Sequence, residues 1–78
     1  MTIKLTRHAK NNMRLYKITT ADIKEVIERP TSKESQEGKI VAISPIQNKF
    51  RKMPLKVVYT VEKDQVKIIT AYPLKKAY

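Results

Sequence analysis

The chain has 78 residues, which is enough for one small domain and leaves no room for a second. It contains no cysteine, so the sequence excludes disulfides and thiolate zinc sites. Seventeen Lys and Arg against seven Asp and Glu give a formal net charge of +10, which favours a polyanionic partner.

The apolar runs fall far short of the roughly 20 residues that a membrane span needs. The basic start MTIKLTRHAK is not followed by an apolar stretch, so the sequence predicts no signal peptide. We therefore expect a cytoplasmic protein that does not act on membranes.

The first predicted helix begins after Thr6, whose hydroxyl can accept a hydrogen bond from an amide of the first turn. Ala9, Met13 and Tyr16 then lie at helical spacing on one stripe. The preceding residues 3–5 are a candidate for a short leading strand.

The segment ITTADIKEVIERP predicts a second helix. Thr19 with Asp22 three residues later resembles a capping box, and Pro30 ends the helix because the residue before a proline is pushed out of the α region. The apolar face of this helix consists of Ile23, Val26 and Ile27. Residues 31–38 are polar, end on the single glycine and are interpreted as a connector.

The second half of the chain changes to the period of β-strands. Residues 39–44, 55–62 and 66–72 alternate or are rich in β-branched side chains, and residues 62–65 are short enough for a hairpin turn. Residues 1–78 are therefore predicted to form one α+β domain, in which two N-terminal helices pack on a small antiparallel sheet of three to four strands.

The segments LTRHAKNNM, ITTADIKEVIERP, PLKVVYTV and VKIITAYPLKK resemble, in order and spacing, a small family known as domain of unknown function 4258. The resemblance covers roughly residues 5–76. That family is placed beside the RelE/ParE-like toxins, several of which cut RNA without a metal. The resemblance thus implies a RelE-like fold and a toxin-type protein. Members often have Arg-Gly where this chain has Tyr16 and Lys17, a departure that removes one cation from the first helix.

The residues give little support to metal or cofactor chemistry. Zinc needs Cys or several His, and the chain has one His and no Cys. A single glycine cannot build a phosphate-binding glycine loop, and no serine has the flanking glycines of a nucleophile elbow. We expect no cofactor and no metal.

His8 is the single histidine, the residue type that gains and loses a proton near neutral pH. One interpretation makes His8 the general acid or base of phosphodiester cleavage, and the other makes it a packed or capping residue of the first helix. Arg14, in the same helix, is the candidate cation that steadies the phosphate in the transition state.

Cations and tyrosines make up the candidate RNA-binding surface. Positive groups neutralise phosphates, and tyrosine rings stack on bases. The candidates are Lys49, Arg51, Lys52, Tyr72, Lys75 and Lys76. Tyr59 alternates with two valines and is expected in the core.

The leading hypothesis is a metal-independent endoribonuclease acting on RNA or ribosome-associated RNA. His8 would transfer the proton, and Arg14, Arg51 and Lys52 would steady the phosphate. The alternative is a non-catalytic module of the same fold that binds nucleic acid or an acidic antitoxin protein. A third interpretation is a relic of the fold that retains neither activity.

Overall fold

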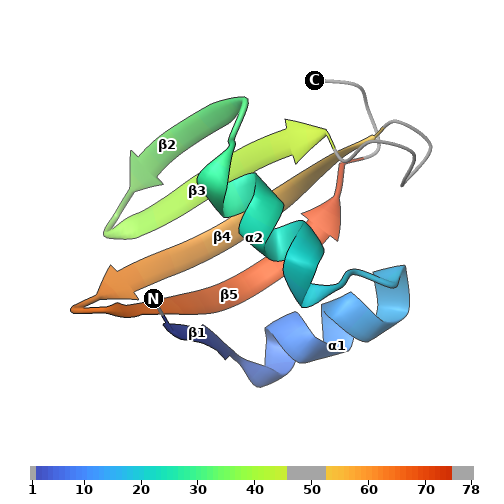
Figure 1. The fold of residues 1–78 in the computed structure, drawn as a ribbon, viewed down its shortest axis with the longest axis horizontal. Coiled ribbons are helices and arrows are strands. Elements are labelled where there is room, and N and C mark those ends of the chain that lie inside the picture. Colours follow the sequence, from blue (N-terminus) through green and yellow to red (C-terminus); the bar gives the residue numbers. More distant parts are fainter. Residues whose placement is uncertain (1, 46–52, 75–78) are drawn as a thin grey trace.

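The computed structural model describes residues 2–45 and 53–74 of the chain. The elements in chain order are β1 (Thr2–Leu5), α1 (Arg7–Tyr16), α2 (Thr20–Glu28), β2 (Ser32–Gln36), β3 (Lys39–Pro45), β4 (Pro54–Glu62) and β5 (Gln65–Pro73). The fold class is α+β, as the sequence predicts. Figure 1 shows α2 crossing one face of the sheet and α1 lying along the edge next to β5.

Helix α1 has defined caps at both ends. The Thr6 hydroxyl accepts a hydrogen bond from the Ala9 amide at 3.1 Å, which confirms the predicted N-cap. At the other end Lys17 adopts the left-handed conformation with φ 56°, and the Ile18 amide donates to the Met13 carbonyl at 2.8 Å. This geometry satisfies the last turn of the helix and directs the chain into α2.

Helix α2 begins with the predicted capping box. The Asp22 amide donates to the Thr19 hydroxyl at 3.1 Å, and the Thr19 amide donates to the Asp22 carboxylate at 3.0 Å. Ile23 and Val26 are fully buried against the sheet, and Ile27 is partly buried beside them. The predicted apolar face is therefore the face that packs.

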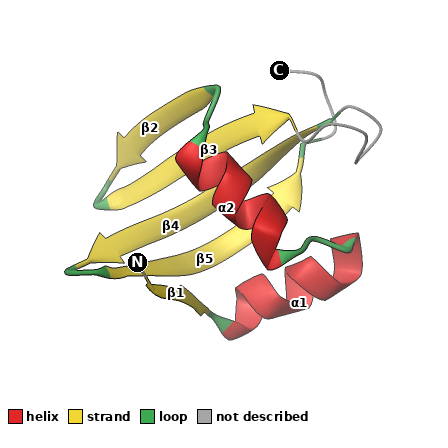
Figure 2. Ribbon diagram, in the orientation of Figure 1, coloured by secondary structure: helices red, strands yellow, loops and turns green. Residues whose placement is uncertain are grey.

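The predicted sheet is wrong in strand number and in strand direction. The described residues form one five-stranded mixed sheet in the order β1-β5-β4-β3-β2, with β1 parallel to β5 and the other pairs antiparallel (Figure 2). The predicted connector 31–38 contains strand β2. As an edge strand, β2 is exposed along most of its length, so it lacks the apolar alternation that marks a strand in a sequence.

Strands β4 and β5 form the predicted hairpin, with Glu62 opposite Gln65. The pairing shifts by one residue near the middle, because Tyr59 pairs with Ile68 whereas Val58 pairs with Thr70. Ile69 is thus an extra residue on β5, which is the definition of a β-bulge.

The core lies between the helices and one face of the sheet. Its buried residues are Ala9, Ile18, Ile23, Val26, Ala42, Leu55, Val57, Tyr59, Val66, Ile68 and Ala71. Tyr59 is in the core as predicted, and its burial raises the pKa of the phenol.

The opposite face of the sheet is called the outer face below. Residues that pair across antiparallel strands share a face, so the registers assign its members directly. The registers place on the outer face Ser32, Glu34, Gln36, Lys39, Val41, Ile43, Lys56, Val58, Thr60, Glu62, Gln65, Lys67, Thr70 and Tyr72.

The Thr6 hydroxyl also donates to the Ile69 carbonyl at 2.9 Å, so one side chain caps α1 and holds the bulge. We predict that Thr6→Ala lowers the free energy of unfolding by about 1–2 kcal/mol, because a cap and a partly buried hydrogen bond are lost together. Thr6→Ser keeps both bonds and is the control, expected within about 0.5 kcal/mol of the parent protein. Urea unfolding measures both variants, and equal stability of Thr6→Ala and Thr6→Ser would contradict the dual role.

Candidate nucleic-acid interface

A row of four paired residues runs across the outer face. Ser32 pairs with Ile43, Ile43 with Lys56, and Lys56 with Tyr72, so the row crosses from β2 to β5. Neighbouring strands lie about 4.8 Å apart, so successive side chains in this row are within contact distance. The row therefore places an apolar side chain, an ammonium group and an aromatic ring next to one another.

The Lys56 ammonium lies over the ring of Tyr72, with Nζ 5.5 Å from the ring centroid. Tyr72 is half-buried, and it reaches the outer face only because of the bulge. In an uninterrupted β5, Tyr72 would share the core-facing side with Val66 and Ile68. The extra residue Ile69 reverses the alternation, so Ala71 enters the core and Tyr72 leaves it.

A second row links the outer face to α1. Val41, Val58 and Thr70 pair across β3, β4 and β5. The Asn12 side-chain amide in α1 donates to the Thr70 hydroxyl at 3.1 Å. This bond makes one side of α1 continuous with the outer face at the edge of β5.

His8 lies on the same side of α1 as Asn12. The two residues are one turn apart and differ by about 40° around the helix axis. His8 is exposed, so its imidazole is available at the junction between α1 and the outer face. His8 thus lies one helical turn before the residue of α1 that contacts the outer face, and its role stays a prediction.

Arg14 does not share that side. It is exposed in the last turn of α1, about 120° around the helix from His8. It lies instead on the outward stripe of α1 with Arg7 and Lys10, both also exposed.

Two further cations lie on the sheet. Lys67 of β5 pairs with Lys4 of β1, so positive charge also lies at the β1 edge of the sheet.

Five of the predicted RNA-binding residues lie outside the described residues: Lys49, Arg51, Lys52, Lys75 and Lys76. Their roles stay predictions. Of that predicted set, Tyr72 is the residue that the structure describes.

Sequence reasoning missed three residues of this site, namely Lys56, Asn12 and Thr70. The alternation of residues 55–62 already places Lys56 on the side opposite the core residues Leu55 and Val57. Asn12 follows His8 by four residues, which is a helical neighbour relation. Thr70 had no usable signal, because the bulge reverses the pattern immediately before it.

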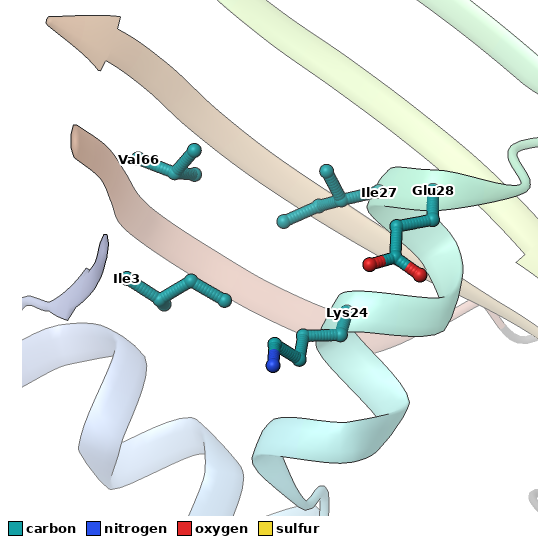
Figure 3. Close-up of a pocket in the computed structure, with 5 residues that line it drawn as sticks. All are labelled: Ile3, Lys24, Ile27, Glu28 and Val66. Carbon is teal, nitrogen blue, oxygen red and sulfur yellow. The ribbon is translucent and has the colours of Figure 1, made fainter. Parts of the chain in front are cut away.

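A pocket of about 170 Å³ lies on the other side of the sheet, between α2 and strands β1 and β5. Figure 3 shows Ile3, Ile27 and Val66 around it, with Lys24 and Glu28 on α2. It contains none of the sequence-predicted site residues. Its lining combines an apolar wall with one cation and one anion, which gives it little preference for a polyanion.

The described residues contain no group of three or more His, Cys, Asp or Glu side chains arranged to hold a metal ion. Neither of the described helices has the length and apolar character that crossing a membrane requires.

Residues 5–73 match the model of the family described as domain of unknown function, DUF4258. No curated protein and no solved structure matches the chain.

Proposed function

Since this chain belongs to the DUF4258 family, whose description names no activity, we propose its function from the geometry: it binds single-stranded RNA on the outer face of its sheet. The observation that carries the proposal is the contact between Lys56 and Tyr72 beside the apolar Ile43. Single-stranded RNA is bound by this combination, because unstacked bases lie on aromatic rings and cations neutralise the phosphates.

Typical interaction energies favour replacement of the Lys56 ammonium on the Tyr72 ring by an RNA base. An exposed cation–π contact is worth about 0.5–1 kcal/mol, whereas a base stacked on an aromatic side chain contributes about 1–3 kcal/mol. A base therefore displaces the Lys56 ammonium from the Tyr72 ring, and the flexible lysine turns to the adjacent phosphate. In the complex the Tyr72 ring contacts the base, and the Lys56 ammonium contacts the phosphate.

The charge around the face supports the same ligand. Lys4 of the edge strand β1 pairs with Lys67 of β5, and Arg7, Lys10 and Arg14 follow the outward side of α1. These cations raise the positive potential on the β1 and α1 side of the sheet, which attracts a strand that stacks on Tyr72. Much of the binding free energy is then electrostatic and falls as salt rises.

We predict that Tyr72→Leu weakens binding of a short single-stranded RNA by about 5- to 150-fold, the equivalent of one lost stacking contact. Tyr72→Phe keeps the ring and is expected to bind like the parent protein. Fluorescence anisotropy measures the affinities, and thermal unfolding confirms that each variant folds. If Tyr72→Leu binds as tightly as Tyr72→Phe, the ring is not a stacking surface.

Lys56→Gln should reduce the slope of log affinity against log salt by roughly 0.7, the value of one single-strand phosphate contact. Lys24→Gln makes the same charge change on α2, on the other side of the sheet, and is the matched control. The control is expected to keep the parent slope. Equal slopes for the two variants would mean that the positive charge acts only as a general field and that the outer face is not the interface.

One observation favours a second function, cleavage of the bound RNA. His8 is exposed one helical turn from Asn12, which is hydrogen-bonded to Thr70 of the outer face. A neutral imidazole there can take the proton from a ribose 2′-hydroxyl, and the resulting oxygen nucleophile attacks the adjacent phosphorus. The bond to the 5′-oxygen of the next nucleotide then breaks, that oxygen takes a proton from water, and the His8 imidazolium returns its proton to the solvent.

We predict that any cleavage persists in excess EDTA, stops with a 2′-deoxy sugar at the cleavage site and yields a 2′,3′-cyclic phosphate. His8→Ala should lower the rate by about 10²–10⁴-fold and leave RNA affinity nearly unchanged. Arg14→Ala, on a different side of α1, is the comparison variant. Loss of cleavage in Arg14→Ala but not in His8→Ala would remove His8 from the reaction. A protein that binds RNA without cutting it would leave binding as the function.

A further inference from the structure

A pocket of about 230 Å³ opens on the outer face beside Lys56. It is lined by Ser32, Glu34, Gln36, Val41, Ile43, Lys56 and Leu74. The Leu74 amide donates to the Pro54 carbonyl at 2.8 Å, which fixes the chain at this end of the sheet. Because Lys56 lines the pocket and also lies over the Tyr72 ring, the pocket belongs to the same surface as that contact.

The pocket has an apolar part and a polar rim on opposite sides. The half-buried Val41 and the largely buried Ile43 of β3 supply the apolar side, and β2 supplies the hydrogen-bonding groups. The Gln36 amide donates to the Glu34 carboxylate at 3.2 Å. This bond orients a carboxylate at the rim of a surface that otherwise carries mainly positive charge.

We infer that this pocket binds a guanine base of the RNA strand, an inference that rests on the proposed function. An ionised carboxylate only accepts hydrogen bonds, and its two oxygens match two adjacent donors. Guanine presents two adjacent donors, N1–H and N2–H, on its Watson–Crick edge, the edge that single-stranded RNA exposes. The base plane lies on Val41 and Ile43, and the carboxylate of Glu34 accepts from both donors.

The other bases match the carboxylate less well. Adenine and cytosine each offer one amino donor beside a ring nitrogen that accepts, and that nitrogen faces a carboxylate oxygen with no proton between them. Uracil offers one N–H between two carbonyl oxygens. A negatively charged rim also repels the phosphate itself, so Glu34 places the base, and not the backbone, at this position.

Lys56 joins the pocket to the stacking residue. It lines the pocket, and its ammonium lies over the ring of Tyr72. One strand spacing of about 4.8 Å separates Lys56 from Ile43 on one side and from Tyr72 on the other. Two consecutive nucleotides therefore occupy the row, with guanine in the pocket, its neighbour on Tyr72 and Lys56 at the phosphate between them.

The test compares heptamers of uridine that carry guanine, inosine or adenine at the central position. Inosine lacks only the N2 amino group, so it removes one of the two donors. We expect the parent protein to bind the guanine heptamer about 5- to 150-fold more tightly than the adenine heptamer, with inosine between them. Equal affinity for all three heptamers would overturn the inference.

Glu34→Ala should abolish the preference for guanine while the affinity for an all-uridine heptamer stays at or above the parent value. Glu25→Ala removes an exposed acid from α2 and is the matched control for net charge. It is expected to raise the affinity for all heptamers equally and to keep the preference. A Glu34→Ala variant that retains the preference would exclude the carboxylate as the guanine acceptor.

The proposed function and this inference fail in different ways. If no heptamer binds at low salt, the RNA-binding function itself is wrong. If heptamers bind without regard to the central base, the function stands and the guanine pocket is wrong. Guanosine monophosphate that binds as tightly as the guanine heptamer would overturn the dinucleotide arrangement, because Tyr72 and the cations would then contribute nothing.

Discussion

The arrangement of this molecule depends on one extra residue in β5 and the side chain that holds it. Ile69 shifts the register of the central hairpin, and Thr6 donates a hydrogen bond to its carbonyl group while capping α1. The same bulge determines which of two neighbouring residues enters the core, since Ala71 is buried and Tyr72 is not. One local irregularity therefore fixes the position of a helix and the chemistry of the opposite sheet face. A cap bond is worth only about 1 kcal/mol, yet it acts in a small domain whose total stability is a few times larger.

The two faces of the sheet differ in composition, and under the proposed function one stabilises the fold while the other recognises RNA. The helix side is closed by aliphatic residues, and its alanines at positions 9, 42 and 71 allow the elements to approach closely. The outer face combines valine and isoleucine with Lys56, Glu34 and Tyr72, a mixture that gives a flat apolar surface with directed polar groups at its rim. Under the proposed function, substitutions of the exposed Glu34 and the half-buried Lys56 and Tyr72 change binding with little cost in stability, whereas Ile43 of the same face is buried and contributes to both. Substitutions on the helix side lower stability with little direct effect on binding.

Local patterns were sufficient to predict both helices, their N-caps and the β4–β5 hairpin, because caps and turns depend on residues only a few positions apart. The edge strands were harder to predict. Residues 32–36 are polar on both sides because an edge strand is exposed, and the parallel pairing of β1 with β5 joins residues at opposite ends of the chain. The residues of the candidate site also differ in whether local patterns predict their positions. Lys56 could be placed from alternation alone, whereas the setting of Tyr72 depends on a bulge whose anchor, Thr6, is distant in sequence.

The bond between Thr6 and Ile69 spans 63 positions in the chain, which has a consequence for synthesis on the ribosome. Chains grow N-terminal end first at about 5–20 residues per second, so α1 leaves the exit tunnel well before its docking partner β5 exists. The β2–β3 hairpin can pair early because its contacts are local, but the apolar stripe of α1 must wait for the last strand. The domain therefore completes its folding only when β5 is available. The row of residues that crosses the outer face is completed in the same step, so a nascent chain presents a basic helix long before it presents the aromatic and apolar surface beside it.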